Sequence, residues 1–142
     1  MQSPVTPHPN GPDASRLRVA WLVYRGNPYS GGQGVYTRYM ARELVDMGHA
    51  IDVICGQPWP NLDPGARLVK LPSLDLFRAD DPWHIPRPHE LRGRDHLDID
   101  LFEFAHMCTS GFPEPWTFSL RARRYFKDHG HEYDLVHDNQ SN

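Results

Sequence analysis

A glycine cluster between an apolar run and a helical pattern limits what this chain can fold into. The segment Ser30-Gly31-Gly32-Gln33-Gly34 follows an apolar run over residues 17–24. That run lacks clean alternation, which is typical of a strand buried on both faces of a parallel sheet. Glycines at a strand-to-helix turn let backbone N–H groups approach a ligand closely, and the helix N-terminus behind them favours negative charge. The segment therefore predicts a first, central strand followed by a ligand-binding loop.

The residues after the glycines predict a helix and a second strand. Apolar side chains at three- and four-residue spacings predict a stripe along a helix of about three to four turns. The stripe contains Val35, Tyr36, Tyr39, Met40, Leu44 and Met47. Gly48 stands where a left-handed cap would end the helix, and residues 51–54 follow as a short strand. This strand–helix–strand unit predicts an α/β fold with a parallel sheet.

Two further strands are predicted, with a proline-rich segment before the next helix. Residues 66–71 and 133–137 have the composition of a third and a fourth strand. Residues 72–94 contain four prolines, which exclude a long regular element there. A segment of this length is either a functional lid or an irregular surface excursion, and both interpretations stay open.

Two more helices are predicted before the last strand. Over residues 96–108 the helical spacing predicts a helix that packs on the sheet through an apolar stripe. This stripe contains Leu97, Leu101, Phe104, Ala105 and Cys108. A second helix begins over residues 118–126 and ends at Gly130. Its arginines, Arg121, Arg123 and Arg124, are candidates to bind phosphate, although a solvated face is favoured because charge runs usually face water.

Composition restricts the class of protein. A length of 142 residues favours one domain, and a net charge of −3 gives no support for nucleic-acid binding. The nine histidines show no metal-ligand spacing, so no metal site is expected. The two cysteines, far apart and without a secretory signal, favour reduced thiols in the cytoplasm. No apolar run reaches the roughly 18 to 20 residues of a membrane span, which leaves only peripheral membrane contact open.

The two ends of the chain carry separate expectations. Residues 1–15 are rich in proline and polar residues, so they predict a disordered extension before a domain over residues 16–142. The chain stops within about five residues of its last strand, before the helix that should cover it. We therefore expect an incomplete domain, the front part of a longer protein.

Taken together, these motifs resemble the N-terminal domain of family 4 glycosyltransferases. The resemblance is carried by Gly31-Gly32-Gln33-Gly34-Val35-Tyr36-Thr37-Arg38-Tyr39, by Ala41-Arg42-Glu43-Leu44 and by Gly48-His49-x-Ile51-x-Val53. The ending Tyr133-Asp134-Leu135-Val136-His137-Asp138-Asn139-Gln140-Ser141 fits the same family's next signature. Residues 68–76 and 107–115 look like an actinobacterial branch of it.

The resemblance implies a fold and an activity. Such enzymes have the GT-B architecture, in which two Rossmann-like domains face each other across a cleft and the N-terminal one mainly binds the acceptor. They transfer a hexose from a nucleotide-diphosphate sugar with retention of configuration, and generally hold no metal or further cofactor. The expected partners are therefore the donor sugar, a small-molecule, lipid or glycan acceptor, and a missing C-terminal domain that grips the donor. The piece alone is expected to be inactive, in the cytoplasm or at the inner face of the membrane.

The resemblance also nominates site residues. Gly31, Gly32, Gln33 and Gly34 would lie near the donor diphosphate, where the helix N-terminus favours the charge that grows on the leaving group. Many relatives end the fourth strand with His-x-His, whereas here the second position is Asn139. An amide does not exchange protons as imidazole does, so Asn139 or Asp138 would instead bond sugar hydroxyls. His137 is either a catalytic candidate or a strand-end histidine that only shapes the loop.

Other functions fit the residues less well. A nicotinamide-dependent dehydrogenase would carry Gly-x-Gly-x-x-Gly and an acid after the second strand, whereas this chain has Cys55-Gly56-Gln57 there. No Gly-Lys-Ser/Thr follows the glycines, which argues against a P-loop NTPase. A non-catalytic binding module with a glycosyltransferase-like half domain remains the alternative from a different class.

Overall fold

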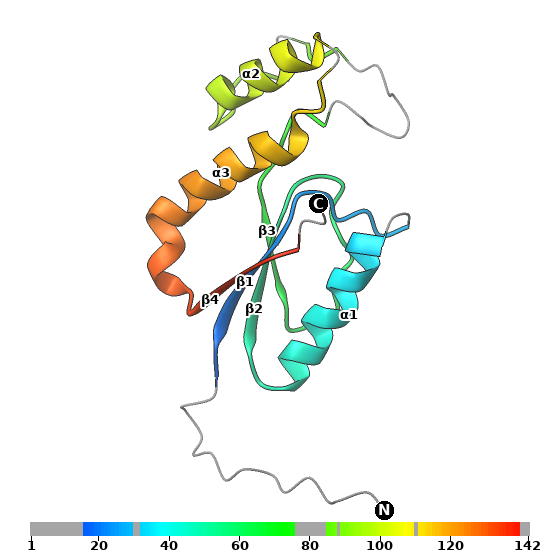
Figure 1. Ribbon diagram of the computed structural model, residues 1–142, viewed down its shortest axis with the longest axis vertical. Coiled ribbons are helices and arrows are strands. Elements are labelled where there is room, and N and C mark those ends of the chain that lie inside the picture. The colour runs from blue at the N-terminus through cyan, green and yellow to red at the C-terminus, as the bar shows by residue number, and fades with distance from the viewer. Residues whose placement is uncertain (1–15, 30–31, 76–84, 88, 110, 140–142) are drawn as a thin grey trace, which may run out of the picture.

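A computed structural model describes residues 16–29, 32–75, 85–87, 89–109 and 111–139. Its core is a sheet of four strands, namely β1 (Arg18–Val23), β2 (Ala50–Cys55), β3 (Arg67–Lys70) and β4 (Leu135–Asp138). The order across the sheet is β3-β2-β1-β4, and every neighbouring pair is parallel. The predicted Rossmann-like parallel sheet is therefore confirmed (Figure 1). The expected disordered extension over residues 1–15 lies outside the described residues.

Three helices and one short turn complete the described chain. They are α1 (Gly32–Asp46), α2 (Leu97–Met107), α3 (Glu114–His129) and the 3₁₀ turn η1 (Gly130–Glu132). Gly48 has a φ of +97°, which confirms the left-handed cap after α1. The described parts of the proline-rich segment contain no helix or strand, as predicted, and no described helix is long and apolar enough to cross a membrane.

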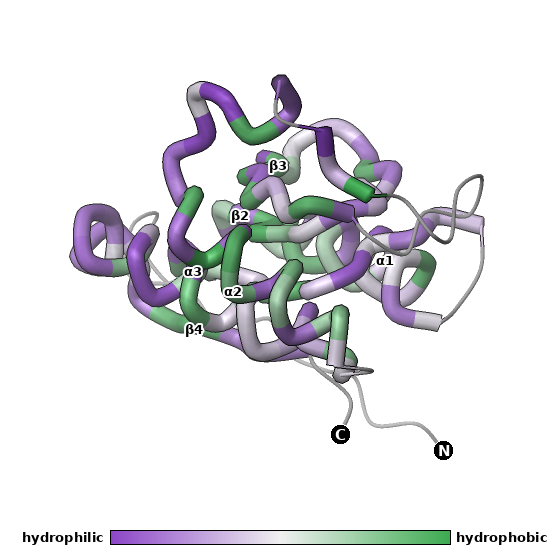
Figure 2. Tube along the Cα trace, turned by 90° about the horizontal axis from the view of Figure 1, so that it is seen from above, coloured by the Kyte–Doolittle hydropathy of each residue, from purple (hydrophilic) through white to green (hydrophobic). Residues whose placement is uncertain are grey.

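α1 and α3 cover opposite faces of the sheet. Alternate residues of β1 point to the two sides, so Trp21 packs under α1 and Ala20 packs under α3. On the α1 side the core also contains Val19, Val23, Ala41, Ile51, Val53 and Cys55. On the α3 side it contains Ile54, Leu71, Phe118 and Ala122. Figure 2 shows the most hydrophobic stretches of the chain along the strands between these helices.

The predicted apolar stripe of α1 is confirmed only in part: Met40 and Leu44 pack against the core, but most of the other stripe residues are exposed. The buried residues are Gly34, Thr37 and Ala41, whereas Tyr36 and Tyr39 are each about half exposed. A helix that lies close to a sheet needs small side chains at the contact, because large ones would hold the two backbones apart. The large side chains of α1 therefore border the contact or face outward.

α2 does not pack on the sheet, which corrects the second helix prediction. It lies on α3, on the side of α3 away from the strands (Figure 1). Its buried face carries Ile99, Asp100 and Glu103, while the predicted stripe residues Leu97 and Leu101 are exposed. The carboxylates face inward because α3 presents a cation to them.

That cation is Arg121, which corrects the prediction of a solvated face for this arginine, whereas Arg123 is exposed as predicted. Arg121 is 1% exposed, and its Nη2 lies 2.6 Å from Asp100 Oδ1 and 2.7 Å from Glu103 Oε2. Arg94 pairs with the other oxygen of Asp100, and Thr117 donates to Glu103 at 2.9 Å. Buried charges are tolerated when they are paired and hydrogen-bonded in this way. The cluster fixes α2 to α3.

Candidate functional site

The predicted site residues at the end of β4 lie beside the end of β1. Because these parallel strands are in register, His137 stands opposite Trp21 and Asp138 opposite Leu22. The backbone N–H of Asn139 donates to the carbonyl of Leu22 at 3.0 Å. All three predicted residues therefore lie at the carboxyl edge of the sheet, the edge at which open α/β folds bind ligands.

His137 rests on a buried aromatic side chain. Its ring centroid lies 4.0 Å from that of Trp21, and the two planes are inclined by 30°. Trp21 is 3% exposed, and its ring also contacts Tyr36 of α1 at 6.1 Å. His137 itself is exposed. The imidazole is thus positioned by the core and still accessible to a ligand.

Asn139 connects the end of β4 to α1. Its Nδ2 donates to the hydroxyl of Thr37 at 3.3 Å, and Thr37 is fully buried. The side chain therefore has a structural role at the position where many relatives place a second histidine. A bond to a sugar hydroxyl from the same amide stays a prediction.

The glycine cluster divides into two kinds of position. Gly32 begins α1 and is exposed, and a Cβ built there would meet nothing within 4 Å. A Cβ at Gly34 would lie 2.1 Å from the carbonyl oxygen of Asn27, so only glycine lets α1 approach the preceding loop. Gln33 is half-buried, and Gly31 lies outside the described residues. Gly34 is therefore required for packing, and Gly32 is open to a ligand.

The start of α1 is electrostatically suited to an anion. This helix of 15 residues has no acidic side chain in its first turn. The partial positive charge of its N-terminus is therefore not neutralised from within that turn. Gly32 is open, Asn139 contacts Thr37 of α1, and His137 rests on Trp21, which also contacts Tyr36 of α1. This end of the sheet, where α1 begins and β4 ends (Figure 1), therefore combines a helix start suited to an anion with polar side chains.

A partly buried ion pair at the same edge was not predicted from the sequence. Arg25, two residues after β1, places Nη1 3.1 Å from Oε2 of Glu114, the first residue of α3. Glu114 is 7% exposed, and burial raises the pKa of its carboxyl to about 7. An acid at a helix start is ordinary, so the sequence gives no sign of this pairing.

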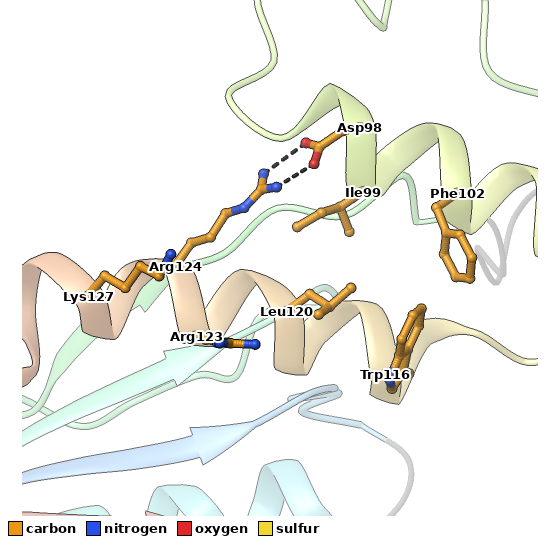
Figure 3. A pocket seen from close by; sticks show the side chains of 8 residues that line it. All are labelled: Asp98, Ile99, Phe102, Trp116, Leu120, Arg123, Arg124 and Lys127. Atoms are coloured by element: carbon orange, nitrogen blue, oxygen red, sulfur yellow. Dashed lines mark hydrogen bonds and ion pairs between the residues drawn. The ribbon is translucent and has the colours of Figure 1, made fainter.

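A groove between α2 and α3 lies apart from the predicted site residues (Figure 3). Phe102 and Trp116 form one end, with ring centroids 4.8 Å apart. Arg124 holds Asp98 through both nitrogens, and this hydrogen bonding lowers the pKa of Asp98 to about 2. Both Arg123 and Arg124 line the groove, but the charge of Arg124 is already paired with Asp98, which makes it a poor phosphate ligand.

Comparisons with known proteins agree with the resemblance. The model of Glycosyltransferase Family 4 matches residues 30–142. A protein of Mycolicibacterium hassiacum named MMP alpha-(1->4)-mannosyltransferase is 51% identical over 125 residues, which cover 87% of this chain. The same alignment covers 29% of that relative, so the chain spans less than a third of its length.

Proposed function

Since the chain belongs to glycosyltransferase family 4, we propose that the protein containing it transfers a hexose from a nucleotide-diphosphate sugar to an acceptor with retention of configuration. The observation that carries this proposal is the anion-suited start of α1, with an open Gly32, at the carboxyl edge of the sheet. Mannose is the first donor sugar to test, because the relative is named a mannosyltransferase.

The described residues supply binding and electrostatics in this proposal. The N-terminus of α1 would favour the negative charge that grows on the leaving diphosphate as the glycosidic bond breaks. His137 packs on the ring of Trp21 and is exposed to solvent. Its ring nitrogens would therefore hydrogen-bond a hydroxyl of the donor or acceptor, or exchange a proton with that hydroxyl. A nucleoside-diphosphate sugar is the co-substrate, and no further cofactor is proposed.

The test is transfer by the complete protein with a panel of nucleoside-diphosphate sugars, mannose first. Gly32→Val should leave the fold intact, because the added side chain enters open space, and should abolish or strongly reduce transfer. Asp46→Val is the matched control, since it puts the same side chain on an exposed position at the other end of α1. The control should transfer normally.

Two outcomes would contradict the proposal. Absence of both turnover and nucleotide binding with every donor would refute a glycosyltransferase. Nucleotide binding without turnover would favour the non-catalytic module instead. Normal transfer by Gly32→Val would show that the glycine loop has only a structural role.

A further inference from the structure

The Arg25–Glu114 pair connects the loop after β1 to the start of α3. Arg25 is immediately followed by Gly26, the first residue of the stretch that leads to α1. Glu114 belongs to α3, which begins at the carboxyl side of the sheet and runs back along it (Figure 1). The side chain of Glu114 is 8% exposed and that of Arg25 is 26% exposed. This contact is therefore largely shielded from water, where an ion pair is stronger than at a surface.

The loop next to Arg25 has little freedom to move. The N–H of Gly26 donates to the carbonyl of Pro58 at 2.9 Å, and a Cβ on Gly26 would lie 2.4 Å from Pro60 Cδ. On its other flank the Asn27 carbonyl lies against Gly34 of α1. A displacement of Arg25 would thus pass directly to the backbone that supports the first turn of α1.

The charges around Glu114 come from four parts of the chain. Arg25 and Arg121 favour its ionised form, whereas Glu103 of α2 and Asp75 after β3 oppose it. Arg121 is engaged by Asp100 and Glu103, so Arg25 makes the close contact with Glu114. Burial opposes ionisation most strongly. These opposing effects place the pKa of Glu114 at about 7, so its charge changes with pH near neutrality.

We propose that Arg25 and Glu114 form a positioning pair that holds the loop after β1, residues 26–29, against the first turn of α1 in the conformation needed for sugar transfer. The inference rests on the proposed function and adds to it a residue pair from the loop after β1 and the start of α3, outside the His137 signature. When Glu114 is ionised, the pair fixes the loop between α3 and α1. When Glu114 is protonated, the ionic part of the contact is lost and the loop is held less firmly.

The pair should make the rate of sugar transfer increase with pH. Glu114 loses its proton as the pH rises through about 7. Transfer by the complete protein should therefore rise over this range. Glu114→Gln keeps an acceptor for Arg25 but removes the charge, so its transfer should be roughly tenfold slower at pH 8, where a weakened hydrogen-bonded charge pair costs about that factor. Its rate should also lose the pH dependence between pH 6 and 8.

The experiment compares Glu114→Gln and Glu114→Ala with Asp98→Asn in the complete protein. Asp98→Asn also removes the carboxylate of an arginine pair, but at an exposed site. Transfer is measured from pH 6 to 8, and hydrogen exchange is measured at the amides of Gly26, Asn27 and Tyr29. The Glu114 variants should exchange faster at these amides, and Asp98→Asn should match the parent in both measurements.

Hydrogen exchange separates this inference from the proposed function. If no variant and no parent transfers sugar, faster exchange in the Glu114 variants still supports the positioning pair, and unchanged exchange overturns it. If the parent does transfer sugar, a Glu114→Gln variant with the parent's rate and pH profile overturns it as well.

Discussion

Replacing the carboxylate of Glu114 by an amide should stabilise the protein at pH 8 much more than at pH 5. Burial raises the pKa of this group from its ordinary 4.5 to about 7 in the folded protein. A raised pKa means that the folded state holds the proton more tightly than the unfolded chain. The resulting stabilisation is complete below about pH 4.5 and is lost as the pH rises through about 7.

The size of the effect follows from the two pKa values. Each unit of difference corresponds to about 1.4 kcal/mol, so the full shift is worth roughly 3.5 kcal/mol, of which about 2.5 kcal/mol is lost between pH 5 and pH 8. Glu114→Gln does not ionise and avoids this loss. Any cost from burying the new amide N–H₂ group applies equally at both pH values, because the amide does not titrate. The difference between the two pH values is therefore the informative quantity.

The assay is urea unfolding followed by circular dichroism at pH 5 and pH 8. The free energy of unfolding of Glu114→Gln relative to the parent should rise by about 2.5 kcal/mol from the lower to the higher pH. A relative stability that stays constant between the two would refute a raised pKa for Glu114. If Glu114→Gln transfers sugar more slowly although it is more stable than the parent, its slower transfer results from a lost positioning role of Glu114 and not from a general loss of structure.

The remaining predictions concern packing, buried charge and thiol access. Gly34→Ala should lower the free energy of unfolding by about 1–3 kcal/mol, because its Cβ would overlap the preceding loop. Arg121→Met should cost about 3–5 kcal/mol by leaving two buried carboxylates without their cation, whereas Arg124→Met at an exposed pair should change stability little; urea unfolding measures both. Alkylation followed by mass spectrometry should label exposed Cys108 in the native protein and buried Cys55, whose pKa is raised to about 12 by burial, only after unfolding.

Local patterns predicted the strands and the first strand–helix–strand unit well. The strand from Arg18 to Val23 was predicted from an apolar run. The cap at Gly48 was predicted because glycine adopts the left-handed backbone conformation more easily than other residues. Such signals lie within a few residues of one another. For that reason the parallel sheet followed from the sequence without any knowledge of tertiary contacts.

The faces of the helices could not be predicted in the same way. Thr37 and Ala41 are buried in α1 because the helix lies close to the sheet. The spacing of apolar residues along the sequence does not predict how close a helix lies to a sheet. Asp100 and Arg121 are buried because each supplies the other's countercharge from a different helix. Hydropathy assigns both to solvent, and only their pairing reverses that assignment.

The candidate site was predicted only in part. The sequence correctly placed His137 and Asn139 at the end of a strand, because strand ends converge at one edge of a parallel sheet. Their supports, Trp21 and Thr37, come from other elements and gave no separate signal. Glu114 was missed because its partner lies on a distant loop.

The position of β4 at the margin of the sheet has a consequence for handling the chain. Among the described residues β4 pairs only with β1, and Leu135 and Val136 are each about half exposed. An edge strand with exposed apolar side chains can pair with a strand of another molecule. This polypeptide expressed on its own should therefore self-associate through β4. A lysine in place of Val136 would act as a gatekeeper against such aggregates.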